Sequence, residues 1–403
     1  MRGTPLPYEP AAVGWRRAGL ALGVVATTLT RSVDAEPLRL RADALAESRS
    51  PTGLIVLSAQ DQARPWLDAD AVVWAGTRPD AAADVMVLTV RVRAPQGWGE
   101  ARAGRFVIAT GAIRPLQIDG VSALARAPSG TTAEAFAGAP VVPRFGEREI
   151  EIAGGGRLAQ TVGAATKVGV SYVQQRGHGE IANEEIGADF ASLPVPWLDV
   201  AARSAYSLQT TGFADALASA AVRSGAFRIE SFATHRSASR LLPATSLFSV
   251  LGDFPSRTLG STVRWQAAPR LDVLASAALQ SVAGDLGANG WIRGLLRLDD
   301  RGDGTVGLEL RRQSVATARW TGVRTVLTQP LGGGLKYSNE LELVLPDAHT
   351  DGAVAWPWAL VALSWRPRGA WEIAGALEAS ATPQHRAQTT ALARVSHSWE
   401  VRP

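Results

Sequence analysis

The chain of 403 residues has no cysteine, only two lysines and no apolar run long enough to cross a bilayer as a helix. Without cysteine there are no disulfides, thiolate metal sites, iron–sulfur clusters or thioether haem attachments, so any redox cofactor would belong to a partner. Hydrophobic residues make up 46% of the chain, yet its mean hydropathy is only +0.03. Apolar content without apolar runs favours alternating strands over membrane helices.

An excess of charge of one sign is also absent. The formal net charge is +4, with 41 Lys and Arg against 37 Asp and Glu. No basic run with interleaved aromatic residues occurs, which argues against nucleic-acid binding. Partners that recognise a strongly charged surface are therefore not indicated.

The N-terminus has the layout of a secretory signal. Arg16 and Arg17 form a basic edge, residues 18–29 form a short apolar core, and Val33 and Ala35 place small residues at the −3 and −1 positions. We expect cleavage before Glu36 and export by the general secretory route, because the residues around the arginine pair fit a twin-arginine signal poorly. A soluble N-terminal helix is the alternative, and the arginine pair also has a weak likeness to a twin-arginine signal.

The main feature that is present is a period-two pattern that recurs to the C-terminus. Leu271, Val273, Ala275, Ala277 and Leu279 occupy every second position of one stretch. In an extended strand such residues share one face. Comparable strands, each with one apolar and one charged face, are predicted at 83–93, 197–208, 304–312, 335–345 and 371–379.

Strand length separates a membrane barrel from a soluble sandwich. These stretches run about nine to twelve residues, the length that a tilted strand needs to cross hydrocarbon, whereas strands of soluble sheets average about five or six. Aromatic residues next to predicted turns resemble the interfacial girdles of membrane barrels. They are Trp197, Trp265, Trp291, Trp356, Trp358, Trp365, Trp371 and Trp399. We predict an all-β, closed antiparallel transmembrane β-barrel, with a sandwich, propeller or β-solenoid as the alternative.

The strand number and domain layout follow from the links. Compact turns containing Pro or Gly alternate with more varied links, which we assign to the periplasmic and outer sides respectively. About 330 residues at about 18 per strand and loop give about 18 strands, with 16 or 20 allowed. The expected layout is a signal peptide at 1–35, an N-terminal periplasmic segment at 36–50 and an outer-membrane barrel at 51–403 of a Gram-negative bacterium.

Period-two counting turns a set of charged side chains toward the lumen. Such residues either set the ion preference of a hydrated channel or satisfy one another as cross-strand ladders. Since their signs are mixed, we predict weak ion selectivity. The set comprises Arg91, Arg93, Asp199, Arg203, Arg264, Asp272, Glu309, Arg311, Glu340, Glu342, Glu372 and Glu378.

The alternation fails longest between His235 and Arg257. The apolar middle of this stretch is unusual for a solvated loop, so it is a candidate constriction that folds into the lumen. Packing on the barrel rim and docking of a partner are the alternatives. The candidate constriction residues are Leu241, Leu242, Leu247, Phe248 and Leu251.

No catalytic, cofactor-binding or metal-ligating set is predicted. The five histidines lie far apart in the sequence, and the glycine triplets lack the lysine and helix pattern of a phosphate loop. An outer-membrane enzyme therefore has little support from the residues.

With these features in hand, residues 50–403 resemble outer-membrane β-barrel porins of Gram-negative bacteria. Three stretches, at 104–115, 136–143 and 241–253, are similar to a group of barrels tied to polysaccharide secretion. This resemblance implies a barrel of about 18 strands that works with a separate periplasmic Wza-type protein, in outer-membrane lipid, after insertion by the barrel assembly machinery. The expected function is the exit pore for a secreted polysaccharide. A general diffusion porin and a scaffold barrel around a periplasmic cytochrome are the alternatives.

Overall fold

The computed structural model describes residues 38–48, 52–64, 66–77, 81–141, 151–237, 255–282, 284–315, 318–348, 355–367, 369–382 and 385–401. Within these residues every regular element is a β-strand, and no helix is long and apolar enough to cross a membrane. The expected signal peptide and all five candidate constriction residues lie outside the described residues.

The described residues form 22 strands. In chain order they are β1 (Leu38–Glu47), β2 (Thr52–Arg64), β3 (Leu67–Thr77), β4 (Ala81–Arg93), β5 (Gly99–Ile108), β6 (Leu116–Arg126), β7 (Thr131–Pro140), β8 (Ile152–Val162), β9 (Thr166–Gly177), β10 (Glu180–Val195), β11 (Leu198–Ser207), β12 (Gly212–Ser224), β13 (Phe227–Arg236), β14 (Ser256–Ala268), β15 (Leu271–Val282), β16 (Asp285–Arg297), β17 (Thr305–Val315), β18 (Ala318–Gly332), β19 (Leu335–Pro346), β20 (Trp356–Trp365), β21 (Trp371–Thr382) and β22 (His385–Val401).

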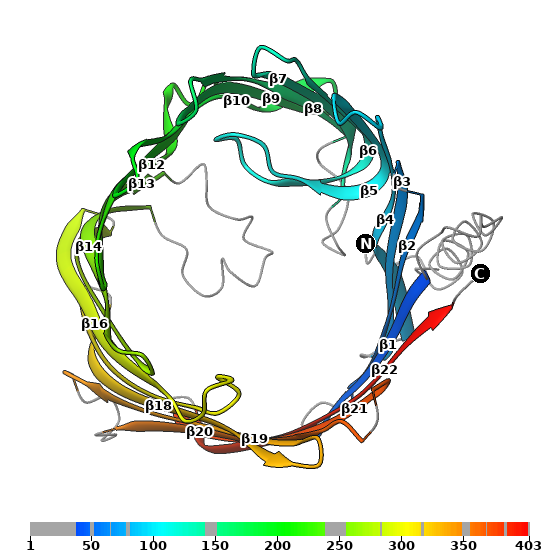
Figure 1. Ribbon diagram of the computed structural model, residues 1–403. Coiled ribbons are helices and arrows are strands. Elements are labelled where there is room, and N and C mark those ends of the chain that lie inside the picture. Colours follow the sequence, from blue (N-terminus) through cyan, green and yellow to red (C-terminus); the bar gives the residue numbers. More distant parts are fainter. Residues whose placement is uncertain are drawn as a thin grey trace, which may run out of the picture.

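The strands close into a single ring (Figure 1). Each pairs antiparallel with the next, and β1 pairs with β22 from Leu38 opposite Val401 to Glu47 opposite Leu392. The predicted closed antiparallel barrel is thus confirmed, and a two-sheet sandwich is excluded for the described chain. The expected periplasmic segment at 36–50 needs correction, because β1 lies within it and completes the barrel wall.

The predicted strand number is wrong. The structure has 22 strands where about 18 were expected, because residues 38–401 use roughly 17 residues for each strand with its link and the barrel begins before residue 51. Twenty-two strands spaced about 4.8 Å apart and tilted about 40° enclose a ring of about 45 Å between opposite backbones. Allowing for side chains, about 30 Å remains for a lumen.

The outward face of the wall is apolar. On β17, Leu308 and Leu310 are exposed and lie beside Ile292 of β16 on one face. Glu309, the residue between these two leucines, lies on the other face of the strand and opposite Arg293 of β16. In water such a surface would be costly, whereas in a bilayer it is what a spanning barrel presents to lipid.

Exposed tryptophans mark one end of the barrel. The end that carries the compact turns also carries the start of β1 and the end of β22. The tryptophans exposed there are Trp66, Trp98, Trp197, Trp265, Trp365, Trp371 and Trp399. This ring fits an interfacial girdle. Trp291, Trp356 and Trp358 were wrongly assigned to the girdle, since register places them on the charged face, where the Trp358 indole donates to Glu378 at 2.8 Å.

Candidate pore lining and constriction

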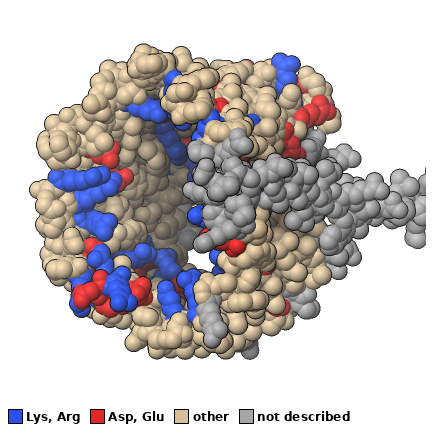
Figure 2. All heavy atoms as spheres, turned by 45° about the vertical axis from the view of Figure 1, so that its right-hand side comes forward, with Lys and Arg blue, Asp and Glu red and all other residues tan. Residues whose placement is uncertain are grey.

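Charged side chains gather on the inner wall of the barrel. In Figure 2 most Lys, Arg, Asp and Glu atoms lie in and around the opening, and the outer wall in view is mostly uncharged. Adjacent strands bring opposite charges together because inward-facing residues meet their cross-strand neighbours. The charged face therefore carries ion pairs between neighbouring strands at several places around the wall.

The structure finds a polar partner for nearly all of the predicted lumen residues. Each lies on the face opposite the exposed apolar residues. Arg91 and Arg93 pair with Asp68, Asp199 with Arg223, Arg203 with Asp215, Arg264 with Asp272, Glu309 with Arg311, Glu340 with Arg324, and Glu372 with Arg366 and Arg394, while Glu378 accepts from Trp358 and Glu342 lies opposite Arg324 in register.

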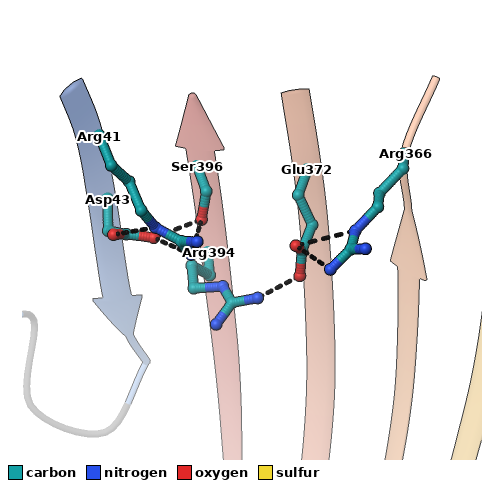
Figure 3. Close-up of polar contacts among 6 residues, drawn as sticks. All are labelled: Arg41, Asp43, Arg366, Glu372, Arg394 and Ser396. Carbon is teal, nitrogen blue, oxygen red and sulfur yellow. Dashed lines mark hydrogen bonds and ion pairs between the residues drawn. The ribbon is translucent and has the colours of Figure 1, made fainter. Parts of the chain in front are cut away.

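Polar side chains lie at and beside the seam between the first and last strands, where Ser396 bonds across it to Asp43 (Figure 3). The Arg41 guanidinium donates to both carboxylate oxygens of Asp43 at 2.8 and 2.9 Å, and Ser396 of β22 donates to Asp43. Next to it, Glu372 accepts from Arg366 at 2.9 and 3.1 Å and pairs with Arg394. The seam is thus held by side chains as well as by the β1–β22 ladder.

One hairpin leaves the wall and folds into the barrel. β4 and β5 pair only from Leu88 opposite Arg105 to Arg93 opposite Glu100, although β4 begins at Ala81. Figure 1 shows the far part of β5 and the link to β6 curving into the ring. We call residues 104–119 the inner hairpin; it bends at the end of the barrel opposite the termini.

Glycines permit the bend. Gly104, Gly120 and Gly138 lie opposite one another on β5, β6 and β7. Gly104 has φ +120°, and a Cβ there would lie 2.0 Å from the Leu88 carbonyl oxygen. A Cβ on Gly120 would lie 2.1 Å from the Ala137 carbonyl oxygen. Since no other residue fits such approaches, this row lets the hairpin turn inward without breaking its pairing with β7.

Two side chains of the inner hairpin donate hydrogen bonds to backbone carbonyls of β4 in the part of that strand that does not pair with β5. The buried Arg105 donates to the Val85 carbonyl at 2.6 Å, and Gln117 donates to the Met86 carbonyl at 2.6 Å. The Arg105 guanidinium also makes a two-pronged contact with Asp119, at 2.7 and 2.8 Å. Side chains thus replace strand pairing at a stretch of sheet edge that would be costly to leave unsatisfied.

The apolar face of the inner hairpin packs on the inside of the wall. Phe106, Ile108, Ile113, Leu116 and Ile118 are buried in one cluster. Three wall residues complete this cluster, namely Phe136, Ala153 and Val173 from β7, β8 and β9. Val107, on the other side of β5, is exposed. The hairpin is therefore a second layer inside the barrel.

Polar contacts fix the link of the inner hairpin to β7–β10. Thr110 donates to Glu134, and Arg114 lies 3.7 Å from the fully buried Glu185. Gly111 has φ +57°, and a Cβ there would lie 2.9 Å from Ser171 Oγ and 3.0 Å from an Asp189 oxygen, so this position favours glycine. The link is packed in place rather than lying free in the lumen.

Sequence reasoning missed this hairpin. Residues 104–115 were noted only for their similarity to polysaccharide-secretion barrels, and the constriction was expected at 235–257 instead. A glycine row at matching register is visible only once strands are paired. Across the described residues no group of His, Asp and Glu is arranged to hold a metal ion.

Comparison with known proteins bears on the fold. No protein-family model and no curated protein matches the chain. Among solved structures, the E. coli P pilus tip assembly intermediate PapC-PapD-PapK-PapG matches 92% of this chain with a TM-score of 0.52 and 10% identity. The chain covers 62% of that one, less than two thirds of its length.

Two further structures were found at lower similarity. The P pilus usher (PapC) translocation pore has a TM-score of 0.47 and 10% identity, over 90% of this chain and 99% of the other. The Pseudomonas aeruginosa outer-membrane protein OpdK has a TM-score of 0.42 and 11% identity, over 91% and 99%. At such identities a match concerns the fold alone. The class that the fold defines is a closed antiparallel β-barrel with the apolar outer face typical of outer-membrane barrels.

Proposed function

We propose that this protein is a translocation pore of the outer membrane of a Gram-negative bacterium. The observation that carries the proposal is a closed ring of 22 strands with an apolar outside, charged residues inside and a packed hairpin within the ring. An enzyme would need a convergent reactive set, and the inner wall offers paired ladders instead.

The width of the ring supports transport of something larger than small solutes. Barrels of 16–18 strands already leave an aqueous channel, and the wider lumen of 22-stranded outer-membrane transporters is filled by a plug. Here the inner hairpin fills part of the lumen, on the side of β7–β10. A wide lumen narrowed by a packed element suits a large or extended cargo.

The more specific proposal is that the cargo is a secreted polysaccharide. A flexible sugar chain needs a wide, hydrated wall that binds it weakly at many places. Two of the three stretches that carry the resemblance to polysaccharide-secretion barrels meet where the inner hairpin packs on β7, since Phe106, Ile113 and Phe136 share one buried cluster. A periplasmic Wza-type channel would deliver the chain, and the energy would come from elsewhere.

A general diffusion porin is the second candidate, favoured by the lining of paired charges. A porin conducts steadily without a partner, whereas an exporter depends on one.

A scaffold barrel around a periplasmic cytochrome is the remaining alternative. It predicts that the chain copurifies with a multihaem protein.

Deletion of the gene tests the proposal. We expect loss of surface polysaccharide with unchanged uptake of small sugars and amino acids, because the pore serves one export route. Complementation with the native chain controls for polar effects. Retained polysaccharide with slowed solute uptake would contradict the export role and favour the porin.

A further inference from the structure

Four acidic residues of the inner wall share one arrangement: each lies between two arginines. Asp68 pairs with Arg91 and Arg93, both at 2.8 Å, and Asp272 with Arg264 at 3.6 Å and Arg297 at 2.9 Å. The other two repeat this pattern, Glu309 with Arg293 and Arg311, and Glu372 with Arg366 and Arg394. We call these groups the arginine triads.

The two signs of a triad are not equally exposed. The acidic side chains are 5–15% exposed and the eight arginines 25–71%. The short carboxylate lies against the wall, and the longer guanidiniums extend over it. Each triad therefore carries one net positive charge and presents it to the lumen. Around the Asp68 triad, Glu100 lies 3.6 Å from Arg93 and pairs with Arg102 at 3.4 Å, and Asp70 lies on the same face of β3, so the excess positive charge is clearest at the other three triads.

Three of the four triads lie toward the end of the barrel that carries the termini. Asp68 and Asp272 each follow a compact turn at that end by one or two residues, and Glu372 is the second residue of β21. The Glu309 triad lies nearer the middle of β17. A solute entering from this end meets arginines before it reaches the level of the inner hairpin.

We propose that the arginine triads make the pore prefer anions and that its cargo carries carboxylate groups, as an acidic polysaccharide does. This inference rests on the proposed pore function and replaces the weak selectivity expected from mixed signs. A planar guanidinium matches a carboxylate through two parallel hydrogen bonds. Guanidiniums that are already paired bind a passing carboxylate weakly, so the chain is attracted and released in turn.

The test is the reversal potential of the purified full chain in planar bilayers across a KCl gradient. We expect chloride to be preferred over potassium by roughly two-fold or more. The variant Arg264→Gln/Arg293→Gln/Arg366→Gln removes one arginine from each of three triads and leaves every acid at least one partner. Its permeability ratio should fall toward unity.

Arg312→Gln is the matched control. Arg312 is similarly exposed and paired with Asp347 at 2.5 Å, but register places it on the outward face beside Gly290. It should leave the ratio unchanged. As a cargo probe, oligogalacturonate should interrupt the current in the native pore more often than maltohexaose, and less often in the triple variant.

The outcomes separate this inference from the pore itself. No conductance by the native chain overturns the proposed function. Conductance that prefers potassium, or an equal response to both oligosaccharides, overturns the anion preference alone.

Discussion

Replacing residues 107–117 with Asn-Gly is expected to raise the single-channel conductance by roughly a third or more. A packed layer about 10 Å thick on one side of a lumen about 30 Å wide occupies much of the cross-section, and its removal opens that space to ions. The substitution keeps Phe106 opposite Ile118, so that a two-residue turn can close the shortened hairpin. Conductance in planar bilayers is the measurement.

The control shortens a link that does not fold inward. Residues 208–211 join β11 and β12 at the same end of the barrel, and Ser207 lies opposite Gly212, so Asn-Gly also fits there. This variant should conduct like the native chain. Equal conductance of all three proteins would mean that the inner hairpin lies outside the conduction path.

A cross-link checks where the hairpin rests. A Cβ on Gly187 would lie 3.0 Å from Ala112 Cβ, close enough for a disulfide after a small relaxation. Because the native chain has no cysteine, Ala112→Cys/Gly187→Cys can form only one intramolecular disulfide, and non-reducing electrophoresis separates it from disulfides between molecules. We expect the oxidised and native proteins to conduct alike, and failure to cross-link would contradict the packed position.

Substitution of Arg105 by alanine is expected to cost about 3–5 kcal/mol of the free energy of unfolding. Arg105 is buried, and its guanidinium contacts Asp119, Asp84 at 3.2 Å and the Val85 carbonyl. Its loss leaves carboxylates without their main partner and a carbonyl without a donor. Urea unfolding of the lipid-reconstituted protein measures the change.

Two variants complete this test. Arg105→Lys should fall between the native chain and alanine, because an ammonium cannot make the two-pronged contact with Asp119 and reach Val85 together. Arg312→Ala removes an exposed ion pair and should leave the unfolding midpoint unchanged. If Arg105→Ala behaved like Arg312→Ala, the role of Arg105 at the edge of β4 would be wrong.

Much of the wall could be predicted because its two faces differ strongly in polarity. The stretches expected at 335–345 and 371–379 correspond to β19 and β21, since Leu and Trp alternate there with Lys and Glu. The strand number could not be counted from such contrast. β8 begins Ile-Ala-Gly-Gly-Gly and β12 is rich in Ala, so neither has two clearly different faces.

The inner hairpin could not be predicted for a different reason. Phe106 and Ile108 alternate as they would in a lipid-facing strand, but the bend at Gly104 turns them against the inner wall. Period-two counting shows which residues share a face, but it does not show whether that face contacts lipid, water or another part of the protein. The close approaches at Gly104, Gly120 and Gly138 depend on strand register, which local sequence does not specify.

Thiol labelling of two neighbouring residues on β15 tests most directly that this chain is a membrane barrel with a wet lumen. Ser276 lies on the inner face, where Thr262 donates to it at 3.1 Å, and Ala277 is exposed on the outer face. In outer-membrane vesicles opened to the reagent from both sides, we predict that a water-soluble maleimide labels Ser276→Cys and not Ala277→Cys. We predict the opposite order for a lipid-soluble maleimide. Equal labelling of both positions by the water-soluble reagent would contradict the account.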